Sequence, residues 1–348
     1  MNMIKAILFI FITTLMTICS CMKDDMRPIT EFNTGDGGVF IVCEGNFMYG
    51  NTSLSYYNKT DKSIENTVFL KANGIPLGDV AQSLCIYDST AWIVVNNSGK
   101  IYAIDKNSFK YKGKITGLTS PRYMQFINPN KAYVTDMYSK SIYVVNPNTY
   151  TVTKTIAMNS NSEEIVFCDD KMFVNSWSYD NKILIINTLT DEISDSIEVL
   201  YQPRKIVLDK DKKLWVLCDG GHNGSEFQSD AGIVKINTET LQIEQTYIFE
   251  AGTKAIDLKI NKTGDTIYYI CNNVYRMSIT QTTLPVEEYI KSEGQNFYAL
   301  GCDPENSDLY VSDAVDYMQS GVIYRYNSSA ECIDSFRVGI IPNSFVFK

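Results

Sequence analysis

The chain contains a single histidine, His222, within the polar segment 219–230. Ser-His-Asp catalysis and multi-histidine metal sites both need a partner for the imidazole, either an orienting carboxylate or further imidazoles. Glu44, Asp219 and Glu226 are the carboxylates from which a lyase or lactonase would take that partner. A loop histidine that only faces solvent, or that contacts a ligand, needs no such partner for its imidazole. We therefore expect that the protein is not an enzyme, with a lyase or lactonase as the catalytic alternative.

Other metal and cofactor chemistry has little basis in the sequence. No C-x-x-C pair, calcium-loop pattern or phosphate-binding glycine motif occurs. Seven cysteines follow the first 21 residues, and this odd number argues against a disulfide framework or a zinc site, although one or two disulfides stay open. We expect no bound metal and no resident cofactor. A net charge of −9 without a basic patch argues against nucleic acid as a partner.

Residues 1–20 have the pattern of a secretory signal peptide, with Lys5 ahead of an apolar run too short to span a membrane. The following Ser20-Cys21 resembles a bacterial lipobox and predicts lipidation of Cys21, with an ordinary cleaved signal as the alternative. Residues 21–37 are expected to form a lipidated, flexible tether. Within it, Lys23-Asp24-Asp25 resembles the export signal of surface lipoproteins in Bacteroides-like bacteria. These features predict a lipid-anchored outer-membrane protein that faces the cell exterior.

Residues that could contact a ligand must be held in place by secondary structure. In this chain the expected strands recur as a repeat. Seven apolar segments open with an aromatic residue and lie 40 to 42 residues apart, with two longer steps of 52 and 53, which is the period of β-propeller blades. Each copy has an apolar strand before this segment, another after it and a fourth, more polar strand. The expected fold is all-β: a seven-bladed β-propeller over residues 38–348 with four antiparallel strands per blade. The seven segments begin at Phe40, Trp92, Tyr133, Phe173, Trp215, Tyr268 and Tyr310.

Two further patterns support a closed ring. In six copies the third strand ends in Asn or Asp, whose side chain starts a turn, whereas Met277-Ser278 replaces it in one copy and predicts a weaker blade. Residues 344–347 look like an isolated first strand. Pairing them with the opening strand at 39–43 would close blade one with both ends of the chain and remove an open sheet edge. No segment with helical periodicity reaches a useful length.

One face of such a propeller collects the connections between second and third strands and those between blades. Here these connections are rich in aromatic and amide side chains and hold two arginines, a composition suited to a large, amide-bearing, neutral or weakly anionic ligand. Each residue alone would equally suit a loop end or blade packing. The residues expected to contact the ligand are Phe47, Tyr49, Gln82, Arg122, Tyr123, Tyr138, Trp177, Tyr179, Asp180, Arg204, His222, Phe297, Tyr298, Asp316 and Tyr317.

Several stretches resemble the BtuG type of Bacteroides surface lipoproteins, within the broad YncE-like group of propellers, over nearly the whole mature chain. They include Glu44-Gly45-Asn46-Phe47, Gly78-Asp79-Val80-Ala81-Gln82-Ser83, Ser120-Pro121-Arg122-Tyr123, Trp177-Ser178-Tyr179-Asp180, Asp313-Ala314-Val315-Asp316-Tyr317 and Gly339-Ile340-Ile341-Pro342. The resemblance implies that the protein captures cobalamin or another corrinoid outside the cell. It also implies a partner, a BtuB-like TonB-dependent outer-membrane transporter, to which the vitamin is delivered.

The expected function is therefore corrinoid capture without catalysis. A corrin ring offers apolar faces to Tyr and Trp and a rim of amide groups to Asn, Gln and Asp. A rigid, preformed site would keep the ordering cost of binding low. The alternative of a surface glycan-binding protein would use the same aromatic side chains to stack on sugar rings.

Overall fold

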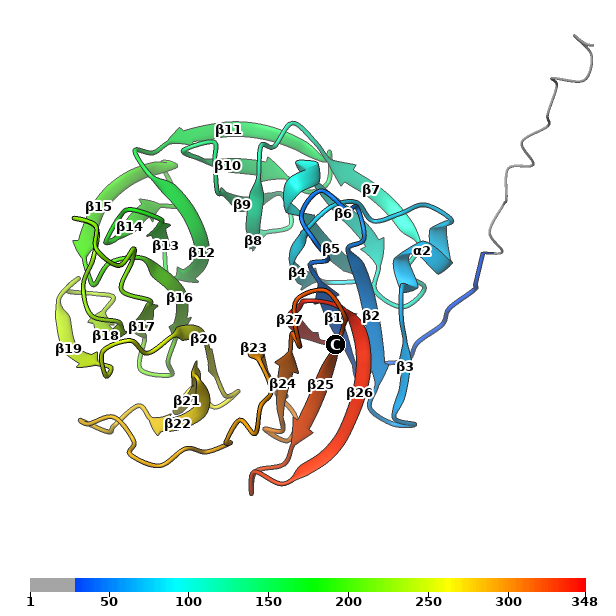
Figure 1. Ribbon diagram of the computed structural model, residues 1–348. Helices are drawn as coiled ribbons and strands as arrows, with labels where there is room; N and C mark the ends of the chain where they lie inside the picture. Colours follow the sequence, from blue (N-terminus) through cyan, green and yellow to red (C-terminus); the bar gives the residue numbers. More distant parts are fainter. Residues whose placement is uncertain (1–28) are drawn as a thin grey trace, which may run out of the picture.

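The computed structural model describes residues 29–348, which form seven β-sheets arranged around a central axis (Figure 1). Within these residues six sheets have four strands and one has three, and neighbouring strands pair antiparallel. This arrangement confirms the predicted seven-bladed propeller. The signal peptide, the lipidation of Cys21 and the export signal were predicted for residues 1–25, which lie outside the described residues.

The strands are named from the axis outward in each blade. Blade one contains β27 (Pro342–Phe347), β1 (Gly38–Cys43), β2 (Ser53–Asn58) and β3 (Ser63–Glu65); blade two β4 (Ala81–Tyr87), β5 (Thr90–Val95), β6 (Lys100–Asp105) and β7 (Tyr111–Ile115); blade three β8 (Pro121–Asn128), β9 (Lys131–Asp136), β10 (Ser141–Asn146) and β11 (Thr151–Ala157); blade four β12 (Asn161–Cys168), β13 (Lys171–Trp177), β14 (Lys182–Asn187) and β15 (Glu192–Glu198).

The remaining blades follow the same order. Blade five contains β16 (Pro203–Leu208), β17 (Lys213–Cys218), β18 (Gly232–Asn237) and β19 (Ile243–Ile248); blade six β20 (Ala255–Ile260), β21 (Thr266–Cys271) and β22 (Asn273–Ser278); blade seven β23 (Phe297–Cys302), β24 (Leu309–Asp313), β25 (Ser320–Tyr326) and β26 (Cys332–Ile340). Two short helices, α2 (Val68–Asn73) and the 3-10 helix η1 (Asn96–Ser98), lie in connections. Neither spans two full turns, in line with the absence of helical periodicity.

The ring is closed by both ends of the folded chain. The inner strand β27 pairs with β1, with Val39 opposite Phe347, and it packs beside the inner strands β23 and β4 of the neighbouring blades. All six residues of β1 are buried, so an open β1 edge would leave unpaired backbone N–H and C=O groups and expose apolar side chains to water. The predicted closure of blade one is thus confirmed.

Blade six departs from the four predicted strands. After β22 the chain from 279 to 296 forms no strand, and its backbone pairs with the sheet at an isolated bridge between Val274 and Ile290. In the other blades an Asn or Asp at the end of the third strand starts the turn that leads to the fourth strand. In blade six the Ser278 N–H instead donates to the Gln281 side chain at 2.8 Å. The copy that lacks Asn or Asp at this turn is therefore the one that lacks the fourth strand.

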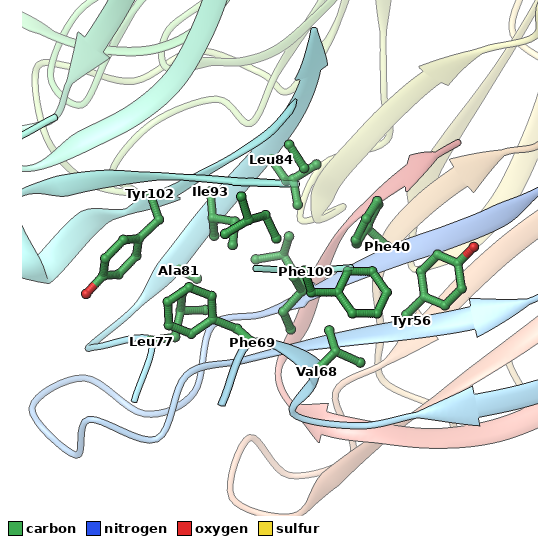
Figure 2. Close-up of a cluster of buried hydrophobic side chains, with 14 of the residues drawn as sticks. Phe40, Tyr56, Val68, Phe69, Leu77, Ala81, Leu84, Ile93, Tyr102 and Phe109 are labelled. Atoms are coloured by element: carbon green, nitrogen blue, oxygen red, sulfur yellow. The ribbon is translucent and has the colours of Figure 1, made fainter. Parts of the chain in front are cut away.

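Apolar side chains fill the wedges between blades. Figure 2 shows the wedge between blades one and two, where Phe109 lies at the centre with its ring 5.6 Å from Phe40 and 5.2 Å from Tyr56. The helix α2 covers this wedge with Val68 and Phe69, both almost fully buried. Because these rings meet edge-on or tilted, they bury large area in favourable aromatic geometry.

The segment 30–36, called the N-terminal strap below, packs on the propeller. Phe32 places its ring 5.0 Å from Phe109, and both the N–H and the hydroxyl of Thr34 donate to the Asn107 carbonyl at 3.1 Å. Lys348 donates to the Thr34 carbonyl at 2.8 Å. The flexible tether predicted for 21–37 therefore does not extend through the strap, because an aromatic anchor and backbone hydrogen bonds fix residues 32–34 to blade two.

We expect Phe32→Ala to lower the free energy of unfolding by about 1–2 kcal/mol, less than the 3–5 kcal/mol typical of a fully buried Phe, because Phe32 is only partly buried. Urea denaturation of the chain from residue 29 on measures this change. Ile29→Ala, at an exposed neighbour, is the control that should cost nothing. Equal midpoints for Phe32→Ala and wild type would mean that the strap does not stabilise the propeller.

Candidate functional site

One face of the propeller gathers exposed aromatic side chains. We call it the loop face, and it consists of the connections between second and third strands together with the starts of the inner strands. Among residues 29–348 five tyrosines are exposed, and four of them lie on these connections; Tyr111 on β7 is the fifth. The exposed large side chains of the second-to-third connections are Phe47, Met48, Tyr49, Tyr138, Tyr179, Tyr317 and Met318. Exposed apolar side chains of this size can contact a ligand or a partner, and here seven of them lie on one face.

Several of these residues hold a backbone conformation that is unfavourable for them. Met48, Tyr179 and Tyr317 have φ angles of 68°, 61° and 64°, in the left-handed region. Ser178, directly before Tyr179, also lies there with φ of 62°. Such residues cost of order 1 kcal/mol or more each and cluster at binding sites, where the surrounding structure holds them in place. Two of the exposed tyrosines of the loop face, Tyr179 and Tyr317, are therefore presented from strained turns.

His222 belongs to this face and makes aromatic contacts there. Its ring lies 4.3 Å from that of Tyr179, tilted by 30°, and Phe227 approaches Tyr179 edge-on at 5.6 Å. Asp219 uses its carboxylate to accept the Gly221 N–H at 3.0 Å and thereby shapes the loop. Within residues 29–348 no carboxylate hydrogen-bonds the imidazole. His222 is thus placed to contact a ligand through its ring face.

The inner strands surround a cavity of about 290 Å³ on the axis, at the centre of the loop face. We call it the central mouth. Each inner strand gives it one residue at or next to its second position, and each has a register shift there that turns the side chain toward the axis. These seven residues are Gln82, Arg122, Glu163, Arg204, Ile256, Tyr298 and Asn343; Glu44, Val80, Trp177, Lys205 and Asp257 complete the lining.

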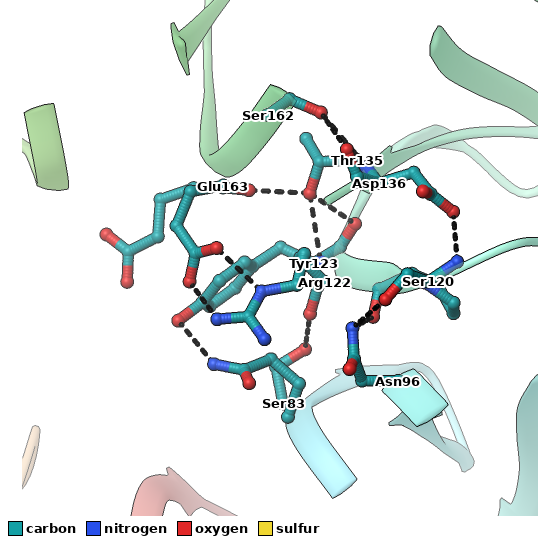
Figure 3. A network of polar contacts seen from close by, with 12 residues as sticks. Ser83, Asn96, Ser120, Arg122, Tyr123, Thr135, Asp136, Ser162 and Glu163 are labelled. Atoms are coloured by element: carbon teal, nitrogen blue, oxygen red, sulfur yellow. Dashed lines mark hydrogen bonds and ion pairs between the residues drawn. The ribbon is translucent and has the colours of Figure 1, made fainter. Parts of the chain in front are cut away.

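Four charged side chains at the central mouth form two ion pairs. Arg122 forms a two-pronged ion pair with Glu163, with N–O distances of 2.6 and 2.7 Å (Figure 3). Burial alone would lower the pKa of Arg122, but Glu163 raises it above its ordinary value, so the pair stays ionised. Lys205 pairs with Glu164 at 2.9 Å and also donates to the Tyr123 hydroxyl at 2.8 Å.

Side-chain hydrogen bonds from one blade to the next hold the mouth in shape. The hydroxyl of Ser83 donates to the Arg122 carbonyl at 2.6 Å, and Thr135 donates to the Glu163 carbonyl at 2.5 Å (Figure 3). Across the ring closure, the Asn343 amide donates to the Gln82 carbonyl at 2.7 Å. Because both side chains and backbone are fixed before a ligand arrives, little ordering is left for binding.

Glu44 is the acid of the mouth without a cationic hydrogen-bond partner. It accepts a hydrogen bond from the Tyr298 hydroxyl at 3.2 Å. Burial raises the pKa of the Glu44 carboxyl above its ordinary value, and Arg122, Tyr298 and Arg204 offset part of the rise. Glu44 therefore keeps its proton to a higher pH in the folded protein than in the unfolded chain.

This difference predicts a pH dependence of stability. Above the ordinary Glu pKa of about 4.3 the unfolded chain loses the proton first, so stability falls as the pH rises toward the higher folded pKa of Glu44. We expect Glu44→Gln to show a smaller fall of the thermal midpoint over that window than wild type does. Glu226→Gln, at an exposed glutamate, is the control that should follow wild type. Parallel curves for Glu44→Gln and wild type would contradict the prediction.

The structure brings part of the predicted residue set together. Gln82, Arg122, Trp177, Arg204 and Tyr298 line the central mouth, and Tyr123 lies beside it, bonded to Lys205. The predicted residues on the surrounding exposed loops are Phe47, Tyr49, Tyr138, Tyr179, His222, Asp316 and Tyr317.

Two predicted residues lie elsewhere. Phe297 is 3% exposed and packs with Ile290 and Leu300 in the core, because the register shift in β23 turns the next residue, Tyr298, to the axis instead. Asp180 lines a separate groove of about 410 Å³ beside the outermost strand β15, so it is not brought together with the mouth.

Sequence reasoning missed four charged residues that build the mouth, namely Glu163, Glu164, Lys205 and Asp257. The signal that could have found them is positional. In each copy they come within three residues of the start of the inner strand, at the places occupied by Arg122 and Tyr123 in blade three. Four charges at one end of buried strands need partners, which the ring of neighbouring strands supplies.

Among the described residues no group of three or more His, Cys, Asp or Glu side chains could hold a metal ion. All seven described cysteines are free, and burial raises the pKa of Cys43 to about 12. No helix in residues 29–348 is long and apolar enough to cross a membrane.

The fold and the mouth define a seven-bladed β-propeller with an aromatic loop face around a charge-lined axis. Propellers of this kind are closed, rigid rings whose connections can vary freely. The chain belongs to the family described as "Domain of unknown function (DUF5074)", which matches residues 37–347. No curated protein matches the chain.

Solved structures share the fold at low sequence identity. A quinoprotein alcohol dehydrogenase-like protein from Bacteroides thetaiotaomicron superposes with a TM-score of 0.70 at 14% identity, covering 90% of this chain and 79% of that one. A protein from Lactobacillus plantarum gives 0.68 at 13%, covering 90% and 100%. The periplasmic gluconolactonase of Pseudomonas aeruginosa gives 0.66 at 12%, covering 88% and 98%. At these identities the likeness shows the fold alone, and the functions of these neighbours differ.

Proposed function

We propose that the chain captures cobalamin or another corrinoid on its loop face, without catalysis, and delivers it to a TonB-dependent outer-membrane transporter. The observation that supports this most is the presence, on the same face as the polar central mouth, of seven exposed aromatic and methionine side chains from four blades. A corrin ring has two broad apolar faces and a rim of acetamide and propionamide groups. Aromatic and thioether groups suit the faces, and the polar groups of the mouth suit the rim.

The charge balance of the mouth favours a ligand with little net charge. Arg122 and Lys205 are already paired with Glu163 and Glu164 at 2.6 and 2.9 Å, and Arg204 lies 3.8 Å from Asp219. A strongly anionic ligand would have to compete with these carboxylates for the cations. A neutral, amide-bearing ligand would add hydrogen bonds without breaking an ion pair.

We further propose that the protein is held at the outer membrane by lipid on Cys21, facing the exterior. The support is the leader sequence with its Ser20-Cys21 junction and the following Lys23-Asp24-Asp25. The gluconolactonase neighbour raises the question of catalysis, but His222 makes ring contacts and no carboxylate hydrogen bond among the described residues. A lactonase would need an oriented base that this loop does not supply.

Calorimetric titration of the chain from residue 29 on with cyanocobalamin tests the proposal. Saturable binding at one site per chain is expected. Binding of oligosaccharides with no binding of cyanocobalamin would overturn the proposal in favour of a surface glycan-binding protein, in which the same exposed tyrosines would stack on sugar rings.

The double variant Tyr138→Ala and Tyr179→Ala should weaken cyanocobalamin binding roughly thirtyfold, because truncation of aromatic anchors at a binding site costs about 2 kcal/mol. Both side chains are more than half exposed, so the thermal midpoint should change little. The matched control is Tyr111→Ala, at the exposed tyrosine of β7 away from the loop face. Unchanged affinity in the double variant, measured by calorimetry, would remove these two residues from the site.

A further inference from the structure

Three aspartates recur at the same place in the repeat, and we call them the loop aspartates. Asp136 and Asp313 are the last residues of β9 and β24, and Asp219 directly follows β17. Each stands where the second strand of its blade enters the loop face. Asp136 is fully buried and Asp313 is 7% exposed. A buried carboxylate is costly unless hydrogen bonds satisfy it, so the partners of these residues show what they hold in place.

The carboxylate of Asp136 joins two separate connections of blade three. Its Oδ1 accepts the backbone N–H groups of Tyr138 and Ser139 at 3.0 and 2.8 Å. Its Oδ2 accepts those of Thr119 and Ser120 at 3.2 and 2.6 Å, and Figure 3 shows Asp136 beside Ser120. The first two residues belong to the connection between β9 and β10, and the other two lead into the inner strand β8. One buried side chain therefore fixes both connections.

Asp313 makes the same link in blade seven. Its Oδ1 accepts the Val315 N–H, two residues further on, at 2.8 Å and the Asn296 N–H at 2.9 Å. Asn296 directly precedes the inner strand β23, and the Ala314 N–H donates to the Asn296 carbonyl at 3.0 Å. The Tyr317 hydroxyl donates to the Asn296 side chain at 3.4 Å. This exposed tyrosine is thus tied to the junction that Asp313 holds.

Asp219 makes a related link in blade five. Its Oδ1 accepts the Gly221 N–H at 3.0 Å, and its Oδ2 accepts the side-chain amide of Gln202 at 3.2 Å. Gln202 directly precedes the inner strand β16, and the connection continues from Gly221 into His222. In all three blades the aspartate therefore joins the N–H two residues further on to the residue directly before the inner strand.

The two segments that each loop aspartate joins belong to the two halves of the candidate site. Directly after the junctions, the inner strands give the central mouth Arg122, Arg204 and Tyr298. The second-to-third connections of the same blades carry the rings of Tyr138, His222 and Tyr317. A ligand that covers the mouth and reaches these rings depends on how the two halves are placed relative to each other, and the aspartates set that placement.

We propose that Asp136, Asp219 and Asp313 are positioning residues of the ligand site. They act through the connections that they hold and not by contact with the ligand. The inference rests on the proposed function for the identity of the ligand. It adds the side chains that keep the aromatic groups of the loops in register with the mouth before binding, so that little ordering is left when the ligand arrives.

Asp136→Asn keeps the size of the side chain but replaces one acceptor oxygen with an NH2 group, which cannot accept from the N–H groups that face it. We expect cyanocobalamin affinity, measured by calorimetry, to fall roughly fivefold, the effect of about one lost hydrogen bond.

Asp209→Asn is the matched control for this variant. Asp209 is 4% exposed, and its Oδ1 accepts the N–H groups of Asp211 and Lys213 at 2.9 and 2.8 Å. It lies in the connection between β16 and β17, on the opposite side of the propeller from the loop face. Both variants should lose stability, but Asp209→Asn should bind cyanocobalamin as wild type does. Equal losses of affinity in the two variants would mean that Asp136 only stabilises the fold and would overturn the proposal.

A double-mutant cycle shows whether Asp136 acts through Tyr138. In the Tyr138→Ala background, Asp136→Asn should weaken binding less than twofold, because the ring that it positions is already gone. A further fivefold loss in that background would contradict the positioning role. If Asp136→Asn does not fold, Asp313→Asn with Tyr317→Ala gives the same cycle in blade seven.

Amide hydrogen exchange, followed by mass spectrometry, separates this inference from the proposed function because it needs no ligand. Peptides from segment 137–141 should exchange faster in Asp136→Asn than in wild type or Asp209→Asn. Faster exchange there in a protein that does not bind cyanocobalamin would keep the hold of Asp136 on the loop and reject the corrinoid. Equal exchange and equal cyanocobalamin affinity in Asp136→Asn and wild type would reject the positioning role and keep the function.

Discussion

Removal of residues 344–348 should abolish soluble, folded protein. This deletion takes away most of β27, the inner strand of blade one, and leaves the fully buried strand β1 without its partner. Phe345 alone is 8% exposed and packs near Tyr310, so its truncation would already cost about 3 kcal/mol. Typical domains are stable by only about 5–15 kcal/mol, and the deletion adds a lost ladder and an open edge.

Soluble yield and the thermal midpoint measure this effect. Deletion of Lys348 alone is the matched control, since it removes the hydrogen bonds to the N-terminal strap but keeps β27. The control should remain folded with a modest loss of stability. A chain lacking 344–348 that melts as wild type does would mean that β27 is not needed to close the ring.

Glu163→Ala should cost about 3–5 kcal/mol of unfolding free energy. The side chains of Arg122 and Glu163 are 13% and 5% exposed, so the variant leaves a guanidinium largely out of water without its carboxylate. Urea denaturation gives the value. Glu65→Ala, which removes an exposed pair with Lys71 at 2.8 Å, is the matched control and should cost less than about 1 kcal/mol.

The paired replacement Arg122→Met with Glu163→Leu distinguishes the reason for that loss. Apolar residues of similar size often replace a buried ion pair with little or no loss of stability. We expect the double variant to recover most of the stability lost in Glu163→Ala. If the double variant is as unstable as the single one, the ion pair itself, and not the unpaired Arg122, carries the stability.

The repeat made the ring predictable in detail. Aromatic-led apolar strands 40 to 42 residues apart, with two longer steps, predicted the seven blades, and the isolated strand at 344–347 predicted the closure. The missing fourth strand of blade six was predicted only as a weakness at Met277-Ser278, because the absence of a turn signal does not say what the chain does next. The packing of Phe32 on Phe109 joins residues far apart in the sequence, which local patterns do not reveal.

The site was predictable where it depended on loops and unpredictable where it depended on register. Exposed residues such as Tyr138 and Tyr179 follow from the position of the connections alone. In the inner strands a bulge decides which side chain turns to the axis, and one residue of shift exchanges Tyr298 for Phe297. The ion pairs of Arg122 with Glu163 and of Lys205 with Glu164 join different blades, so no single repeat contains them.

The N-terminal strap has a mechanical consequence. It is attached at the connection between β6 and β7, which lies on the opposite side of the propeller from the loop face, and its bonds to Asn107 and Lys348 precede β1 along the chain. A pull applied at residue 29 would therefore load these strap contacts before any force reached β1 or the ring closure. The hydrogen bonds of the strap can break one after another while the blades stay folded. A propeller held by that end would keep its aromatic face turned away from the point of attachment and free under load.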